Sequence, residues 1–511
     1  MAPIWTPQTN AELHRLLRRS GLVLIGVYCA LMPLSFGIAA VSPFNIRQVE
    51  EIAALKAFVS AGWIPSRPVV EFLDRYVSGD SILALTWVRT GICVALLAVA
   101  TLAALYATLL LARSERQVVP STVTLLWRIA LVIGAVNVAI YPMFTQDFWL
   151  SVVWGRMLAS GHNPYYEYFT AAALSGTPLL DFPILMTYGP LWAWVSAAAV
   201  LASGSSVVLM FVSAKLVLFG CWAMALYLIR AILADAPLVH QAGALCCFGW
   251  WPMSAHFAVG EGHNDVASVC LVLLWIHMTT RKSHAWSLLP LIGSVLIKYL
   301  SAPLLLIAAW EGLVRDKRGR GMWVLAAICS GILAVGATIP LWRDRHFFDP
   351  LLSLGRWQFL APAGAGSTVL QWIGLPAARG LTTMAVVMVF AAFVLYYGMQ
   401  FVRASSRHNL IQIVLAVSCA IMFASLGHVW PWFLISVLAP AALAGSGPLW
   451  RFVVAAVLIA PFLDVLWLAA DGWQALPVTG VVFFGTTCVV AASPLAWRRL
   501  EWGRNRAPGS N

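Results

Sequence analysis

The stretch GICVALLAVATLAALYATLLLA at residues 91–112 decides the fold class, because it carries no charged side chain over a length that crosses the hydrocarbon of a bilayer. The rest of the chain has the same character. Of its 511 residues 61% are hydrophobic and 10% are charged, and the mean hydropathy is +0.84. Soluble domains carry about 25% charged residues, and this composition also excludes a disordered or fibrous chain. We therefore predict a polytopic membrane protein.

Apolar stretches bounded by charges predict an all-α transmembrane helical bundle of about fourteen spans, at roughly 20 residues a span. The expected spans are 21–41, 85–112, 122–143, 205–232, 238–257, 266–280, 285–297, 300–313, 321–340, 380–402, 410–427, 431–447, 451–468 and 481–495. The short pair 285–297 and 300–313 could instead form one kinked or re-entrant unit. Residues 189–202 are also apolar, and we expect them to form a helix at the membrane interface.

The basic residues predict the orientation of these spans. They cluster in short connections, which we place in the cytoplasm with both termini because Lys and Arg favour that side. The net charge of +12 therefore indicates topology, and no nucleic-acid partner is invoked. All nine cysteines lie in apolar spans, which is typical of small buried side chains and excludes a framework of loop disulfides.

Three outer segments are long, at about 42–84, 144–204 and 341–379, and a minimal bundle does not need them. The second begins with Asp147, close to the end of a span, and continues through a Gly, Asn, Pro and Tyr cluster that contains Tyr165. Partial desolvation can raise the proton affinity of such a carboxylate toward the range of a base. A solvated cap at a helix end is the alternative for Asp147.

Gly260-Glu261-Gly262-His263-Asn264-Asp265 places four polar side chains between two apolar helices. This hairpin lies on the same predicted face as Asp147, which makes Glu261, His263, Asn264 and Asp265 candidate site residues. A hydrophilic turn without further function is the alternative. His and carboxylates are also suitable ligands for a divalent metal ion, although their spacing matches no standard metal motif.

Several cations and aromatic residues share this predicted outer face or the membrane depth next to it. Lys298 separates two short apolar runs, and an ammonium there usually faces a cavity or a partner such as a lipid phosphate. Lys215 lies within an apolar span and could likewise face a cavity or a partner. The alternative is snorkelling, in which its aliphatic stem lies along the apolar surface while the ammonium reaches the membrane interface. Further candidates are Tyr188 before the interfacial helix, Arg356 in an outer loop and His428 at a break between two spans. Aromatic residues at that break, in His428-Val429-Trp430-Pro431-Trp432, are either belt anchors or sugar platforms.

The string from Asp147 through Gly155-Arg156, Gly161 and Pro164-Tyr165, followed by Tyr188-Gly189-Pro190-Leu191-Trp192, Gly262-His263-Asn264-Asp265 and Lys298-Tyr299, resembles GT-C-type glycosyltransferases. The series is most similar to bacterial polyprenol-phosphate-mannose-dependent mannosyltransferases, particularly the alpha-(1→6) type. The resemblance covers about residues 122–435. It depends on the order of the motifs, since each is weak alone.

The resemblance implies an inverting transferase in the bacterial inner membrane with its site on the periplasmic side. The donor would be a polyprenyl-phosphate sugar and the acceptor a glycan or glycolipid. It implies Asp147 as the base, Asp265 as a second acidic residue, and Lys298 and Lys215 near the lipid phosphate. Residues 1–120 would form a two-span extension, 121–345 the catalytic module and 346–511 further helices. The extension and the lone carboxylate at Asp147 depart from the family pattern, so a metal-dependent pair of aspartates is in doubt.

Two other classes stay open. A transporter or flippase for a lipid-linked sugar would also need intramembrane charges and a cavity, but such folds often contain internal repeats and none is detected here. A membrane scaffold would tolerate replacement of Asp147, Asp265 and Lys298 one at a time. Walker A, Rossmann and GxSxG motifs do not occur in the sequence, which argues against an ATP-driven mechanism within this chain.

Overall fold

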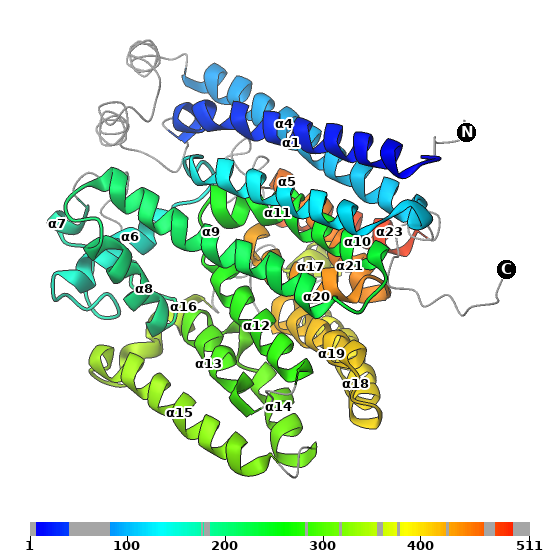
Figure 1. Cartoon of the computed structure of the whole chain (residues 1–511). Helices are drawn as coiled ribbons and strands as arrows, with labels where there is room; N and C mark the ends of the chain where they lie inside the picture. The colour runs from blue at the N-terminus through cyan, green and yellow to red at the C-terminus, as the bar shows by residue number, and fades with distance from the viewer. Residues whose placement is uncertain are drawn as a thin grey trace.

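The computed structural model describes residues 7–39, 82–174, 177, 184–281, 285–315, 319–354, 361–375, 379–425, 429–463 and 476–493. These residues form helices and connections without any strand (Figure 1). The prediction of an all-α membrane protein is therefore confirmed.

Seven helices in the described residues are long and apolar enough to cross a bilayer. They are α1 (Asn10–Ala39), α4 (Ile82–Arg113), α5 (Pro120–Val138), α9 (Val207–Ile232), α15 (Arg320–Thr338), α18 (Arg379–Arg403) and α19 (Arg407–Ala420). A bent pair within 252–280 raises the count to eight if it is one span. Most other predicted spans appear as shorter helices, so the total of fourteen stays a prediction.

The remaining short elements connect or flank these helices along the chain. They are η1 (Glu115–Gln117), α7 (Ala171–Leu174), η3 (Ala285–Ser287), η6 (Ile339–Leu341), η7 (Arg345–Phe348), α16 (Asp349–Leu354), α17 (Pro362–Trp372), η8 (Ile421–Ser425), η9 (Pro431–Leu434), α20 (Ile435–Ala444), α21 (Pro448–Ile459) and α23 (Leu476–Ala492). The N-terminal pair α1 and α4 lie side by side along one edge and pack on α5 and α10 (Figure 1).

The predicted span 238–257 is wrong as a single helix. α10 (Leu238–Gly249) ends before Trp250, and α11 (Pro252–Ser254) begins a new element that continues into the π-helix η2 (Ala255–Gly260). Pro252 explains the break, because its ring forces the preceding residue out of the helical region, and Trp251 has φ −75° and ψ 138°.

A sharp bend follows directly and positions the polar hairpin. The segment Pro252–Gly260 meets α12 (Asp265–Thr280) at 118°, and residues 261–264 form the vertex. Gly262 has φ +85°, and a Cβ atom there would lie 2.5 Å from the Phe148 ring, so this turn requires glycine. Unwound backbone at such a vertex is a place where membrane proteins build polar sites.

A second break carries Lys298. α13 (Leu288–Ile297) ends there, with Lys298 in extended backbone at φ −146°. The chain then continues through η4 (Tyr299–Ser301), α14 (Leu304–Ala309) and η5 (Trp310–Arg315). The expected interruption between two short apolar runs is confirmed, and it places the Lys298 side chain next to α12.

The segment before α9 contributes two packed helices, α6 (Asp147–Ala159) and α8 (Pro190–Leu201), at one end of the molecule (Figure 1). Gly155 allows close packing, since a Cβ there would lie 2.6 Å from the carbonyl oxygen of Ser196. Gly189 does the same against the backbone of Leu296 and donates its N–H to the carbonyl of Ile297 at 2.9 Å. These contacts bring the start of α8 beside the end of α13.

Candidate active site

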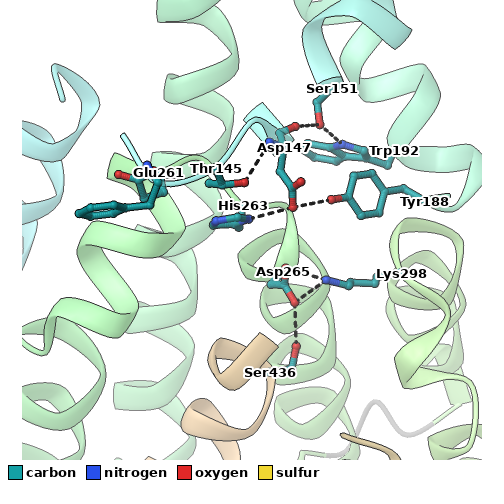
Figure 2. A network of polar contacts seen from close by, with 11 residues as sticks. Thr145, Asp147, Ser151, Tyr188, Trp192, Glu261, His263, Asp265, Lys298 and Ser436 are labelled. Atoms are coloured by element: carbon teal, nitrogen blue, oxygen red, sulfur yellow. Dashed lines mark hydrogen bonds and ion pairs between the residues drawn. The ribbon is translucent and has the colours of Figure 1, made fainter. Parts of the chain in front are cut away.

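The Asp147 carboxylate is the centre of a polar cluster formed by segments distant in the sequence (Figure 2). The Tyr188 hydroxyl donates to Oδ2 of Asp147 at 3.0 Å, and Nδ1 of His263 lies 3.4 Å from the same oxygen. His263 is buried, whereas the Asp147 side chain is 23% exposed. Within the described residues both contacts converge on Oδ2, which leaves Oδ1 available to a substrate.

The local sequence fixes the backbone of Asp147. The N–H of Asp147 donates to the Thr145 hydroxyl at 3.1 Å, and its carbonyl accepts from the Ser151 hydroxyl at 3.1 Å (Figure 2). The Trp192 indole donates to the oxygen of Ser151 at 3.0 Å, which ties α8 to α6. Asp147 is also the first residue of α6, and the positive end of the helix dipole stabilises its carboxylate.

These contacts keep Asp147 ionised. Burial alone raises the pKa of the Asp147 carboxyl, but the contacts from His263 and Tyr188 and the charge of Lys298 outweigh it and hold this pKa below its usual value. Desolvation acts in the direction expected from the sequence, but the net shift of this pKa is downward, toward a weaker base. The sequence placed the carboxylate near the membrane boundary, but it did not show the two donors.

Asp265 and Lys298 form a second buried pair next to Asp147. Nζ of Lys298 lies 2.7 and 2.8 Å from the two carboxylate oxygens of Asp265, and the Ser436 hydroxyl reaches one of them at 3.4 Å (Figure 2). The Phe433 ring lies 4.0 Å from the Lys298 ammonium. In this structure the partner of Lys298 is thus a carboxylate, and the lipid phosphate expected from the sequence is not the group that it contacts here.

Glu261 serves as a clamp between the polar hairpin and the segment that leads into α6. Its carboxylate is fully buried and accepts from the backbone N–H groups of Met143 and Phe144, each at 2.9 Å. Nε2 of His256 lies 3.6 Å from the other oxygen. Because these donors belong to the chain just before Asp147, Glu261 fixes where Asp147 emerges.

Lys215 also binds protein groups. Its ammonium donates to the carbonyls of Val259, at 2.7 Å, and Gly260, at the end of η2. Phe148 and Phe211 lie 5.1 and 5.3 Å from Nζ. The snorkelling alternative is wrong because Lys215 is fully buried. Its role as a phosphate ligand, implied by the resemblance, has no geometric support here.

Aromatic rings surround the cluster. Tyr165 donates its hydroxyl to the carbonyl of Tyr188 at 2.7 Å and stacks on Phe347 with ring centroids 4.3 Å apart. His263 stacks on Trp432 at 4.3 Å with an interplanar angle of 11°. Trp432 is buried in the protein, so this side chain is not a membrane-belt anchor.

An apolar cleft lies beside the cluster, between α6, α8 and α9. The cleft is narrow, with a cavity volume of about 20 Å³, and its lining includes Phe148, Ser151, Trp192 and Gly262. Ser151 and Trp192 thus both line the cleft and hold the backbone of Asp147. Sequence reasoning missed Ser151, which belongs to no charged or Gly-rich motif, and it quoted Trp192 as the end of the segment that begins at Tyr188 without assigning it a role.

Two predicted site residues, Arg356 and His428, lie outside the described residues. In the part of the chain that the structure describes, no three His, Cys, Asp or Glu side chains lie close enough to hold a metal ion. The structure thus brings together Asp147, Tyr188, His263, Asp265 and Lys298. It places Glu261, Lys215 and Tyr165 around them in contacts with backbone.

A comparison with models of protein families gives a match. The model of the family described as alpha-(1→6)-mannopyranosyltransferase, N-terminal domain, matches residues 51–313, which is more than half of the chain. This range contains the two polar pairs, Asp147 with His263 and Asp265 with Lys298. A search of curated proteins finds no match.

Proposed function

This chain belongs to the alpha-(1→6)-mannopyranosyltransferase family and is a glycosyltransferase, and we propose that it transfers mannose from a polyprenyl-phosphate donor to a hydroxyl of a glycan or glycolipid acceptor. The observation that carries the assignment of the site is the Asp147 carboxylate, ionised and 23% exposed at the centre of the polar cluster. The mechanism proposed below follows from its position.

Asp147 acts as the general base. The acceptor hydroxyl gives its proton to Oδ1 of Asp147 while its oxygen forms a bond to the anomeric carbon. The bond between that carbon and the phosphate oxygen breaks, and polyprenyl phosphate leaves with the electron pair. This single displacement inverts the anomeric centre. The low pKa of Asp147 keeps the base deprotonated at neutral pH.

The fixed contacts around Asp147 support catalysis by positioning. Tyr188 and His263 hold Oδ2, while Thr145 and Ser151 hold the backbone of the same residue. A base that is held in one geometry lowers the entropy lost on reaching the transition state. The Asp265–Lys298 pair supplies an ammonium whose charge acts on Asp147, and we assign to Lys298 the contact with the departing phosphate, which one of its three N–H donors can make while the others stay on Asp265.

The apolar cleft beside Asp147 supports a lipid-linked donor. Its lining is mainly Val, Ala, Leu, Phe and Trp side chains from α6, α8 and α9, and an isoprenoid chain is stabilised by such a surface. We place this site on the periplasmic side of a bacterial inner membrane, within a GT-C-like bundle whose termini are cytoplasmic. The support is the distribution of Lys and Arg in the loops.

The test is a transfer assay in membranes that contain the chain. Three radiolabelled donors are compared, each with a short α-mannoside as acceptor. They are polyprenyl-phosphate mannose, polyprenyl-phosphate glucose, and a mannose nucleotide sugar supplied to detergent-solubilised protein without any lipid carrier. We expect label in the acceptor only with polyprenyl-phosphate mannose. Transfer from the nucleotide sugar in the absence of any lipid carrier would contradict the donor assignment. Movement of the lipid-linked sugar across the bilayer without transfer would indicate a flippase.

A further inference from the structure

Asn264 is a buried amide for which the fold provides no partner. The residue is 3% exposed and lies between His263, which contacts Asp147, and Asp265, which binds Lys298. Within the described residues neither Oδ1 nor Nδ2 of Asn264 has a hydrogen-bond partner. Most buried polar groups in folded proteins are hydrogen-bonded, so such an amide requires an explanation.

The position of Asn264 makes its lack of partners more informative. It is the N-cap residue of α12, where Asn is favoured because its side chain accepts from a free backbone N–H in the first turn. Asn264 makes no such bond. Its backbone is helical, with φ −70° and ψ −7°, whereas a capping residue is typically extended, so the amide must find its partners outside the first turn of α12.

Asn137 in α5 shows how the same protein treats a structural asparagine. It is fully buried, its Nδ2 donates to the carbonyl of Ile133 at 2.9 Å, and its Oδ1 lies 3.2 Å from Nδ1 of His256. Both amide atoms of Asn137 are therefore partnered, in contrast to those of Asn264.

Two neighbours of Asn264 add to this set of unsatisfied groups. Nε2 of His263 and Nε1 of Trp432 are buried and, among the described residues, have no partner, although the two rings stack on each other. The hairpin thus carries an unpartnered amide at Asn264 and, on the preceding residue, an unpartnered imidazole nitrogen whose ring stacks on the Trp432 indole. The ligand that complements such a mixture carries several hydroxyls, each a donor and an acceptor.

We propose that the Asn264 amide recognises two neighbouring hydroxyls of a hexose in the active site. Nδ2 donates to the oxygen of one hydroxyl, and Oδ1 accepts the proton of the next, so Asn264 is a specificity-determining residue. The inference rests on the proposed function, and it extends that function to the recognition of the sugar ring. The hexose belongs either to the donor or to the acceptor.

The first test compares stability with activity. Leu replaces Asn at positions 264 and 137, and Asn264→Ala serves as a second variant in case Leu does not fit. We expect Asn264→Leu or Asn264→Ala to unfold at or above the temperature of the wild type in detergent and to lose about tenfold or more in kcat/KM. Asn137→Leu should unfold at a lower temperature, since it removes the partner of the buried Nδ1 of His256.

The second test uses deoxy sugars in a double-mutant cycle. Mannosyl donors and α-mannoside acceptors that each lack one hydroxyl are assayed with wild type, Asn264→Ala and Asn137→Leu. We expect one adjacent pair of deoxy compounds to lose about tenfold or more in kcat/KM with wild type and about twofold or less with Asn264→Ala. If kcat/KM falls with the deoxy donors, Asn264 recognises the donor sugar. If it falls with the deoxy acceptors, Asn264 recognises the acceptor sugar.

The inference would be overturned if removal of each sugar hydroxyl lowered kcat/KM by the same factor in wild type and in Asn264→Ala. An unfolding temperature for Asn264→Ala as low as that of Asn137→Leu, together with those equal factors, would show that the role of Asn264 is structural. Failure of the wild type to transfer mannose would instead contradict the proposed function. In that case calorimetric binding of methyl α-mannoside decides: binding by wild type that Asn264→Ala weakens supports the inference, and no difference overturns it.

Discussion

Tyr188 tunes the base at the scale of single residues. Its hydroxyl donates to Oδ2 of Asp147 and, together with the larger contribution of His263, lowers the pKa of that carboxyl. A general base becomes protonated, and activity falls, as the pH drops through its pKa. The acid limb of kcat/KM in the wild type should therefore lie below the ordinary pKa of an aspartate, which is about 4. Asp147 is thus active across neutral and mildly acidic pH.

Tyr188→Phe removes one of these hydrogen bonds. The pKa of Asp147 should rise, so the acid limb of the kcat/KM profile moves to higher pH while the plateau falls by less than about tenfold. Tyr227→Phe, on the exposed face of α9, is the matched control and should leave the profile unchanged. An acid limb that stays in place in Tyr188→Phe would show that this bond does not set the ionisation of the base.

The sequence predicted the charged residues of the site better than their partners. Asp147, Asp265 and Lys298 are noticeable because a charge in an apolar surrounding is rare. Pairing of Lys298 with Asp265 was not predicted, because the contact joins the end of one helix to the start of another. Ser151, Trp192 and Ser436 carry no such signal, and only their hydrogen bonds identify them.

At the scale of elements, the bent unit of η2 and α12 holds the site together through Glu261. Its carboxylate satisfies the N–H groups of Met143 and Phe144, which have no helical partner before α6 begins. The bend therefore fixes both its own polar vertex and the start of α6.

Glu261→Ala should destabilise the protein by about 2–5 kcal/mol, because it leaves the two buried backbone N–H groups of Met143 and Phe144 without an acceptor. Glu261→Gln keeps one acceptor oxygen and should cost less. Asp349→Ala removes an exposed carboxylate that contacts His346 and should cost less than about 1 kcal/mol. Denaturation in detergent micelles measures all three. Equal stability of Glu261→Ala and Asp349→Ala would exclude the clamp.

Helix breaks were predictable where a charge or a proline marks them. Lys298 and the short runs on either side indicated the break after α13. Pro252 likewise indicated that a helix ends near it. The apolar length of 238–257 nevertheless led to the prediction of one uninterrupted span, whereas α10 ends before Trp250. The 118° bend itself depends on the packing of Gly262 against Phe148, which is a tertiary contact.

At the scale of the whole molecule, an outer cluster ties the segment after α6 to the end of α15. Arg343 lies 2.6 Å and His162 2.8 Å from the two carboxylate oxygens of Glu167, while the Tyr166 hydroxyl accepts from the backbone of Arg343 and Asp344. The contact from His162 lowers the pKa of the Glu167 carboxyl. Burial raises this pKa, and the contact from Arg343 lowers it further, so the net shift is downward. The Glu167 side chain is 31% exposed, so solvent screens this link.

This link should depend on pH in one direction. A carboxyl with a lowered pKa contributes stability above its unfolded pKa and loses that contribution as pH falls through the folded value. Hydrogen exchange at residues 162–168 should therefore accelerate, relative to the rest of the fold, as the pH falls below about 4. Glu167→Gln should remove the pH dependence, and high salt should weaken the link at neutral pH. A pH-independent exchange ratio in the wild type would contradict this account.

Composition and span length predicted the membrane character and the helical bundle, because both follow from the free energy of placing apolar side chains in lipid. They gave no information on which tryptophans form the interior. Trp154, Trp222, Trp250 and Trp275, among others, are fully buried in the protein. An interface and a protein core both accept Trp, and the sequence does not distinguish the two without the contacts.

The central claim is that Asp147 removes the proton of the acceptor hydroxyl. The most direct measurement is a single-turnover assay of Asp147→Asn in nanodiscs, with donor binding measured separately and Asp349→Asn as a control for an exposed outer carboxylate. We expect donor affinity within about threefold of wild type and a chemical step slower by on the order of 10²–10⁴. A single-turnover rate equal to that of the wild type would contradict this claim.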